Sequence, residues 1–291
     1  MTTTPDAAAV SHAAEEFLRT FHDQAPGQQS AGVGACLTVD GRTTYEEFAD
    51  LLTGARRVLD LGCADGALLE VLARHGAEVL AGVDLSAEEL AVARRRSALV
   101  DADLRQGRAQ ELPFPAGSFD AVVSHMAFML MWEVEQVVAE VARVLVPGGM
   151  FAAAVGGGAV EGQAQELFLE LAKPYFQAAT DEGRRMPRLG DRRTRTRDGL
   201  DGILTPAGFS PVTWEFIVID QSGTPEQVWE TSIATFYDVV VLDDGQIAEL
   251  RSAFLAEAPN LMVDGRLPSS MRINFATARR AAGRGAADHL P

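Results

Sequence analysis

Lysine is almost absent from this sequence, and charge of one sign dominates it. Lys173 is the single lysine among 25 basic residues, which we attribute to a bias toward GC-rich codons. The 41 acidic residues bring the formal net charge to −16. A surplus of negative charge opposes sequence-independent binding to nucleic acid or to an anionic membrane. Neither nucleic acid nor a membrane is therefore an expected partner.

Cysteine and long apolar runs are also scarce. Cys36 and Cys63 are the two cysteines, and their spacing fits neither a disulfide framework nor a metal site. The N-terminal segment lacks the basic start and apolar core of a signal peptide, and no apolar run is long enough to span a bilayer. These absences predict a soluble, cytoplasmic protein without a bound metal.

What the sequence does contain is enough apolar residues for a full core. With 291 residues, of which 47% are hydrophobic, it can form one sizeable α/β domain with an elaboration, or two small domains. Apolar stretches predict strands near 56–61, 77–86, 103–106, 119–125 and 147–155, with helices between them. This alternation predicts a doubly wound, mostly parallel sheet, whose ligands bind at the edge where the strands end.

Further elements are expected on both sides of this alternation. Helices are predicted over 7–21 and after Thr43, where Thr43 and Glu46 have the spacing of a capping box, with a loop over 24–35. After residue 156 the pattern predicts the following: a helix over 161–179, an arginine-rich loop over 184–197, a helix and strand over 199–220, helices near 225–240 and 244–257, and a last strand near 271–278. No internal repeat is visible.

The stretch "VLDLGCADG" places an aspartate at the end of a buried strand, directly before a glycine turn. Gly62 would let a ligand approach the backbone, and Gly66 would let the next helix start close to the strand. Asp84 ends the next strand, where its carboxylate could accept hydrogen bonds from two ribose hydroxyls. A strand–helix turn without a ligand is the plain structural alternative. A dinucleotide site is a further alternative, although position 64 is alanine rather than the middle glycine of its motif.

Four motifs in this order resemble the class I S-adenosylmethionine-dependent methyltransferases. "VLDLGCADG" is similar to their first motif, "VDLS" to the second, "GRAQELPFPAGSFDAVVS" to the third segment, and "EVARVLVPGGMFAAAV" to the helix, turn and strand that close the core. The resemblance covers about 45–156, with a final helix, strand and antiparallel strand over 199–277. It implies a Rossmann-like sheet with one antiparallel strand, helical lid insertions, and S-adenosylmethionine as the cofactor.

The resemblance also implies a set of cofactor-binding residues. They are Asp60, Gly62, Cys63, Gly66, Asp84, Leu85, Arg108, Ala109, Gln110 and Ser124. In this set, Asp60 and the Gly62 backbone lie near the methionine amino end, and Asp84 receives the ribose hydroxyls. A cationic ligand with an ammonium group would stabilise the buried Asp60 carboxylate.

The remaining implied roles concern the adenine and the methionine moiety. Leu85 packs on the adenine, while the Ala109 amide and the Gln110 side chain approach its edge. Ser124 lies beside the methionine moiety. The family often has aspartate at the position of Arg108, and an arginine cannot accept a hydrogen bond from the adenine amine, whereas Gln110 can.

His125 is the expected general base, if the acceptor must lose a proton early. It stands at the end of the fourth core strand, facing the expected site, and orienting a loop or contacting the cofactor carboxylate is its alternative role. His22 is a second candidate on the N-terminal segment. The stretch "HMAFMLMW" (125–132) is either core or an adaptable apolar acceptor pocket, and the arginines of 184–197 either face solvent or pair with an anionic substrate or a partner subunit.

These observations predict a small-molecule methyltransferase of secondary metabolism that transfers a methyl group to O, N or C. An enzyme that cyclises the cofactor's aminobutyryl arm or rearranges another substrate is the alternative, and an inactive binding module is a third. A homodimer is compatible with the sequence. The expected units are an N-terminal helical lid (1–50), the cofactor-binding core (51–156), a helical and arginine-rich lid insertion (157–200), the remainder of the core with a helical insertion (201–280) and a flexible tail (281–291).

Overall fold

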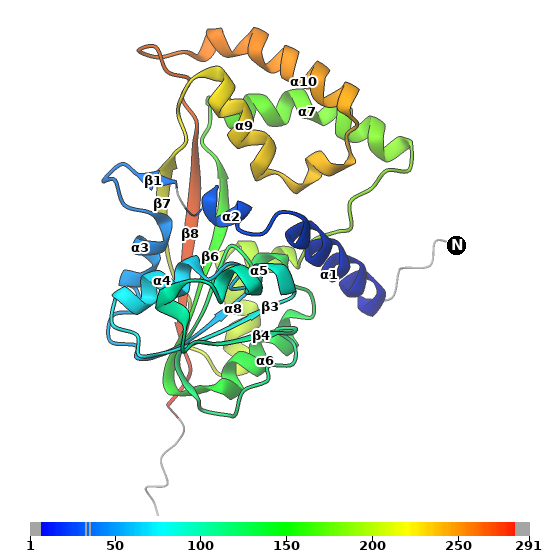
Figure 1. Cartoon of the computed structure of the whole chain (residues 1–291). Helices are drawn as coiled ribbons and strands as arrows, with labels where there is room; N and C mark the ends of the chain where they lie inside the picture. The colour runs from blue at the N-terminus through cyan, green and yellow to red at the C-terminus, as the bar shows by residue number, and fades with distance from the viewer. Residues whose placement is uncertain (1–6, 33, 35, 283–291) are drawn as a thin grey trace, which may run out of the picture.

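An eight-stranded sheet forms the centre of the computed structural model, which describes residues 7–32, 34 and 36–282. The strand order is β1-β7-β8-β6-β5-β2-β3-β4 (Figure 1). The strands are β1 (Leu37–Thr38), β2 (Arg57–Leu61), β3 (Val79–Asp84), β4 (Asp103–Gln106), β5 (Phe119–His125), β6 (Leu145–Ala159), β7 (Thr213–Asp220) and β8 (Ser270–Arg279).

The predicted α/β fold is confirmed, with a parallel core and an antiparallel strand β8. β2 lies between β3 and β5, and all three run in parallel, so that Asp60 pairs with Gly82 on one side and Val123 on the other. β8 runs antiparallel to both β6 and β7. The two-residue β1, which the sequence analysis did not predict, also pairs antiparallel with β7.

Helices cover both faces of the sheet, as a doubly wound fold requires. The α-helices of the described residues are α1 (Ala7–Gln24), α2 (Gln28–Ala31), α3 (Thr44–Asp50), α4 (Ala67–Arg74), α5 (Ala87–Ala93), α6 (Val134–Val144), α7 (Ala164–Asp181), α8 (Arg197–Leu204), α9 (Pro225–Thr235) and α10 (Asp244–Glu257). The cores show the two layers: α6 and α8 pack on one face, and α3, α4 and α5 pack on the other.

Local sequence explains where several of these elements begin. Four of the five β2 residues are fully buried, because a central parallel strand is covered on both faces. The predicted capping box at α3 is confirmed: the Thr43 side chain accepts from the Glu46 amide, and the Glu46 carboxylate accepts from the Thr43 amide. The loop expected over 24–35 is wrong in part, because it contains the single turn α2.

The two insertions after β6 and β7 come together in one helical unit. Helices α7, α9 and α10 share a separate apolar core built around Phe168, Trp229 and Phe254. This helical unit lies at the top of Figure 1, beyond the long strands β6, β7 and β8. The helix expected over 225–240 is shorter than predicted: α9 ends at Thr235, and a 3-10 helix, η6 (Tyr237–Val241), follows.

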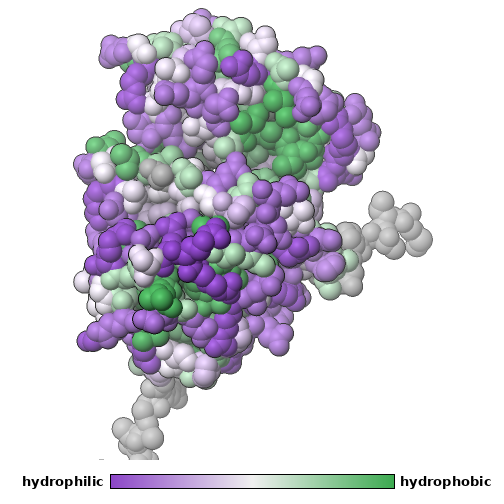
Figure 2. Space-filling model, viewed as in Figure 1, coloured by the Kyte–Doolittle hydropathy of each residue, from purple (hydrophilic) through white to green (hydrophobic). Residues whose placement is uncertain are grey.

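The surface of the helical unit is not uniformly polar. Figure 2 shows apolar surface gathered on the viewed face between α10 and α1, over the η6 region, where Val240 is exposed. Among the described residues, none of the helices has the length and apolar character needed to cross a membrane. The boundaries of the expected units, including the 281–291 tail that lies almost wholly outside the described residues, stay predictions.

Candidate functional site

A cavity of about 470 Å³ opens at the edge where the parallel strands end. Its floor is made by residues at the ends of β2, β3 and β5. Helix α1 and the 3-10 helix η6 contribute the opposite wall. This is the edge where the alternating pattern predicted a ligand site.

The turn after β2 has the backbone geometry of a close approach. Gly62 has φ +73°, and a Cβ at this position would stand 2.4 Å from the Ala127 Cβ, so only glycine fits. Ala64 also has a positive φ, +44°, a conformation that strains an L-residue. Gly66 adopts φ +77° as the N-cap of α4, behind the cavity wall.

Asp60 carries a buried carboxyl group. It lines the cavity, is 2% exposed, and its Oδ1 has no hydrogen-bond partner among the described residues. Burial, together with the nearby Asp84, raises the pKa of Asp60 to about 8. A buried, unpartnered carboxyl is costly unless a donor or a cation reaches it from the cavity.

Asp84 lies at the end of β3 with part of its hydrogen-bonding capacity in use. Oδ2 accepts from the Ala64 amide at 2.8 Å, and Oδ1 accepts from the Ser86 amide at 2.8 Å. Burial raises the pKa of Asp84, and these two amides act in the opposite direction. Each oxygen keeps a second lone pair, so the carboxylate can still accept from a ligand in the cavity.

Leu85, Ala109 and Gln110 line the cavity next to Asp84, where the adenine was expected. Gln110 Nε2 donates to the Glu15 carboxylate at 3.2 Å and to the Trp132 carbonyl at 3.1 Å. With its nitrogen engaged in this way, the Gln110 side chain keeps Oε1 as an acceptor for a ligand. This is the hydrogen-bonding capacity that an adenine amine needs.

Three residues of the expected cofactor set do not line the cavity. Arg108 instead forms ion pairs with Glu15 of α1, at 2.8 Å, and with Glu133, at 3.1 Å, and thereby ties α1 to the loop before α6. Ser124 is fully buried, and its hydroxyl donates to the Leu61 carbonyl at 2.8 Å. Gly66 is the third. Cys63 does line the cavity, and burial raises the pKa of its thiol well above the ordinary value.

The other end of the cavity, beyond β5, is apolar. His125 lies here with its ring 4.7 Å from that of Tyr45 and 5.7 Å from that of Phe48. Its Nε2 is buried and finds no hydrogen-bond partner among the residues that the structure describes, and burial lowers the pKa of His125 to about 3. The imidazole is therefore neutral at physiological pH. Apolar wall residues at this end are Met126, Met129, Leu130, Met131 and Met271.

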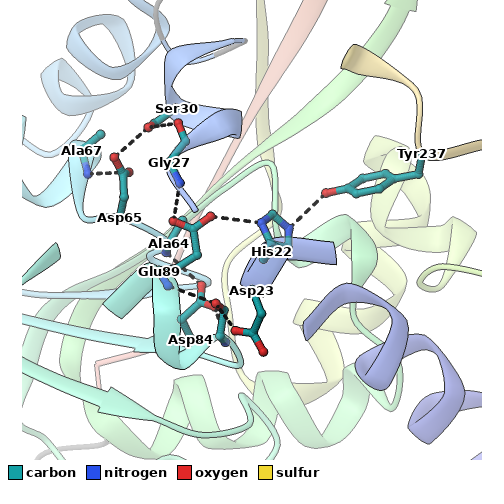
Figure 3. Close-up of polar contacts among 11 residues, drawn as sticks. His22, Asp23, Gly27, Ser30, Ala64, Asp65, Ala67, Asp84, Glu89 and Tyr237 are labelled. Carbon is teal, nitrogen blue, oxygen red and sulfur yellow. Dashed lines mark hydrogen bonds and ion pairs between the residues drawn. The ribbon is translucent and has the colours of Figure 1, made fainter. Parts of the chain in front are cut away.

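A polar chain links α1, the core and the helical unit across the cavity mouth (Figure 3). His22 Nδ1 lies 3.2 Å from the carboxylate of the fully buried Glu89, and the Tyr237 hydroxyl lies 3.3 Å from His22 Nε2. Glu89 also accepts from the Gly27 amide at 2.8 Å. Of these three residues, His22 is the one that sequence patterns indicated. Glu89 and Tyr237 lie 148 positions apart, and no local pattern marks them as neighbours of one histidine.

The Ser86 hydroxyl adds a further bond between α1 and the core by donating to Asp23 at 2.7 Å. Within the described ranges, no group of three or more His, Cys, Asp or Glu side chains is arranged to hold a metal ion. The polar groups of the cavity are thus acidic near β2 and β3, and α1 is held over them by several contacts.

Comparison with known proteins agrees with this geometry. Residues 59–153 match a family described as a methyltransferase domain. Over 97 residues the chain is 39% identical to a fatty-acid O-methyltransferase of Mycolicibacterium smegmatis, which covers 33% of this chain and 35% of that protein. It is 39% identical over 98 residues to a demethylmenaquinone methyltransferase of Thermus thermophilus, covering 32% of this chain and 44% of that protein. The chain thus matches less than half the length of these two relatives.

Solved structures share the fold over most of the chain. The [4+2]-cyclase SpnF aligns with a TM-score of 0.53 and 20% identity, over 96% of this chain and 98% of that one. The order of the strands and the aligned structure show a Rossmann-like fold. The family match and the relatives support, over the part of the chain that they cover, the resemblance to class I S-adenosylmethionine-dependent methyltransferases that the four sequence motifs carry.

Proposed function

We propose that this protein is an S-adenosylmethionine-dependent methyltransferase that acts on a small molecule with an apolar body. The observation that carries the proposal is the unpartnered, 2%-exposed carboxyl of Asp60 at the glycine turn. A ligand that brings an ammonium group to this end would supply the missing partner.

The residues present fit the cofactor. Asp60 and the Gly62 backbone would hold the amino acid end, the free lone pairs of Asp84 would accept from ribose, and Gln110 Oε1 would accept from the adenine amine. Arg108 and Ser124 have supporting roles in this proposal, since one clamps α1 and the other ties β5 to the end of β2. The bound cofactor would supply a methyl group on a cationic sulfonium, an already activated donor.

With an activated donor, the protein's task is chiefly to position the acceptor and to exclude water. The methionine-rich end of the cavity, with Met126, Met129 and Met131, suits an adaptable apolar acceptor. Relatives named for a fatty acid and for demethylmenaquinone support an apolar acceptor class. A role in secondary metabolism, a cytoplasmic location and a homodimer are further parts of the proposal.

His125 suits a positioning role better than that of a strong base. A pKa of about 3 leaves its imidazole unprotonated but a poor proton acceptor while it stays buried between Tyr45 and Phe48. An acceptor that is already nucleophilic, or that loses its proton to solvent, is therefore the better match. His22 is engaged with Glu89 and Tyr237 beside the ribose end.

We further propose that α1 and the helical unit act as a lid over bound ligands. The chain Glu89–His22–Tyr237 joins the core to both of these elements at the cavity mouth. The arginine-rich segment is attached as well, since the Trp132 indole donates to the Arg188 carbonyl at 2.8 Å. Slower hydrogen exchange in α1 and in 184–197 on addition of S-adenosylhomocysteine would support the lid, and unchanged exchange in both would contradict it.

A direct test of the function combines binding with product analysis. Calorimetry with S-adenosylhomocysteine should give saturable binding, and incubation of methyl-labelled S-adenosylmethionine with a panel of apolar hydroxylated or carboxylated acceptors should yield S-adenosylhomocysteine and a labelled acceptor. Failure of the wild-type protein to bind S-adenosylhomocysteine would overturn the proposal.

An enzyme that uses the same site without methyl transfer is the second candidate. This candidate is favoured because the acceptor end has no strong base among the described residues. His125 has a lowered pKa, and no carboxylate within the described part of the chain bonds to it. Cyclisation of the cofactor's own aminobutyryl arm would release methylthioadenosine, and rearrangement of another substrate would leave the cofactor unchanged. The identity of the nucleoside product therefore separates the candidates.

A further inference from the structure

A second cavity, of about 620 Å³, lies beside the first and is lined by the arginine-rich segment. The two cavities share four lining residues: Leu130, Arg195, Tyr237 and Asp238. The second cavity continues between this segment, α7 and η6, away from the glycine turn. A ligand at the apolar end of the first cavity can therefore extend past Arg195 into the second.

Four of the seven arginines of this segment have a carboxylate, carbonyl or aromatic partner. Arg184 pairs with Glu182, and Arg193 pairs with Asp191 and Glu135. The Arg188 guanidinium lies 5.7 Å from the centre of the Trp132 ring, a cation–π arrangement. Arg185 also lines the second cavity, and it donates to the Thr180 carbonyl at 3.4 Å.

Arg192 and Arg195 differ from them. Both line the second cavity, and within the described part of the chain neither guanidinium has a carboxylate, carbonyl or aromatic partner. Arg195 has one polar contact, from its guanidinium to the Met129 sulfur at 3.5 Å. Burial and the neighbouring Arg192 lower the pKa of Arg195, which nevertheless stays a cation. Two adjacent cations without a counter-ion are unexpected in a chain of net charge −16.

The position of Arg195 is fixed by its surroundings rather than by a long flexible loop. It ends the 3-10 helix η4 (Arg192–Arg195), in which Thr194 is fully buried. The preceding residues are held against the chain after β5: the Asp191 amide donates to the Met131 carbonyl at 3.1 Å, and a Cβ on Gly190 would stand 2.1 Å from the Met129 carbonyl oxygen. The guanidinium is thus presented at a defined place, the junction of the two cavities.

We propose that this junction is an oxyanion subsite, in which Arg195, assisted by Arg192, binds a carboxylate or phosphate group of the acceptor. The proposal rests on the proposed function and narrows its substrate class to an elongated amphipathic anion. The apolar body would occupy the methionine-lined end of the first cavity, next to His125. Arginine suits this task because its planar fork can make two hydrogen bonds to one oxyanion. Asp238, which faces both cavities, would keep the anion on the η4 side.

Binding of three ten-carbon probes in the presence of S-adenosylhomocysteine tests the subsite. Decanoate and decyl phosphate carry the two candidate anions, and decanol has the same chain without a charge. In calorimetry, the wild type should bind one of the two anions, and Arg195→Gln should lower the affinity for that anion by about tenfold to a hundredfold. This is the effect of losing a charge-assisted hydrogen bond. Arg192→Gln should weaken it less, and decanol affinity should be unchanged in both variants.

Arg193→Gln is the matched control, since Arg193 lies in the same 3-10 helix but pairs with Asp191 and Glu135 and lines neither cavity. Which of the two anions loses affinity tells whether the site takes a carboxylate or a phosphate. Equal losses for decanol, equal losses in the Arg193 variant, or no preference of the wild type for either anion over decanol would overturn the subsite. Binding of S-adenosylhomocysteine, measured in the same titrations, reports separately on the proposed function and on folding of the variants.

Discussion

Replacement of Asp60 by asparagine should raise the stability of the protein and lower its affinity for the proposed ligand. The carboxyl has a pKa of about 8 in the folded protein against an ordinary value of 3.8. Between these two pH values the unfolded chain ionises Asp60 and the folded chain keeps it protonated. The folded state therefore binds more protons, and its stability falls as the pH rises from about 4 to about 8.

The size of this effect follows from the pKa difference. At pH 7 the carboxyl costs the folded protein at most about 4 kcal/mol, since each unit of pKa difference corresponds to about 1.4 kcal/mol. Asparagine has nearly the same shape as aspartic acid and does not ionise. Asp60→Asn therefore removes this free-energy cost. The melting temperature at pH 7 should rise by several degrees, at roughly 2 °C or more per kcal/mol, and the difference from the wild type should shrink toward pH 4.

The affinity for the ligand should rise with pH, whereas the stability of the free protein falls with pH. At pH 7 about nine tenths of the free protein carries a protonated Asp60, whereas an ammonium group in the cavity favours the ionised form. Binding of S-adenosylhomocysteine should therefore release close to one proton, and its affinity should rise with pH, by up to about tenfold per unit between pH 5.5 and 7.5. Asp60→Asn should remove this pH dependence and weaken binding at pH 7.5 by about tenfold or more.

Calorimetric titrations in two buffers of different ionisation enthalpy measure the proton release, and thermal unfolding from pH 4 to 8 measures the stability. Asp103→Asn is the control, because Asp103 is an exposed carboxylate on β4 that pairs with Arg105 outside the cavity. The reasoning is refuted if Asp60→Asn destabilises the protein at pH 7 and leaves the affinity and its pH dependence as in the wild type.

Three further predictions follow from the same cavity. Asp84→Ala should weaken S-adenosylhomocysteine binding by about one to two orders of magnitude, through the loss of two ribose hydrogen bonds, and unchanged affinity in calorimetry would contradict the assignment. Ala64→Gly should raise the melting temperature without lowering the affinity for S-adenosylhomocysteine, because the positive φ of Ala64 costs roughly 1 kcal/mol that glycine does not incur. A lower melting temperature would contradict this. Tyr237→Phe should speed dissociation of S-adenosylhomocysteine by up to about tenfold in stopped-flow measurements by removing the hydroxyl that contacts His22. Tyr175→Phe, outside the cavity, should have no such effect, and equal rates in the two variants would argue against the lid.

The sequence by itself determined the framework of the site. The apolar strand through Asp60, the glycine at position 62 and the aspartate at the end of β3 are local patterns, and a parallel sheet brings the ends of its strands to one edge whatever the rest of the chain does. Likewise, the capping box at Thr43 is set by residues three positions apart, so it could be predicted without the tertiary structure.

Contacts between distant segments were decided only by the tertiary structure. The sequence gives no signal that His22 lies between Glu89 and Tyr237, or that Arg108 is turned away from the cavity toward Glu15 and Glu133. Ser124 lies in the expected strand, but its side chain points into the protein toward Leu61, because a one-residue step along a strand changes the face. The partners of the arginines in 184–197 come from distant segments: Asp243 before α10 for Arg184, Glu135 of α6 for Arg193, and the Met129 sulfur of η3 (Phe128–Leu130) for Arg195. Packing of the whole chain places these groups, and it therefore decides which arginines lack a carboxylate partner.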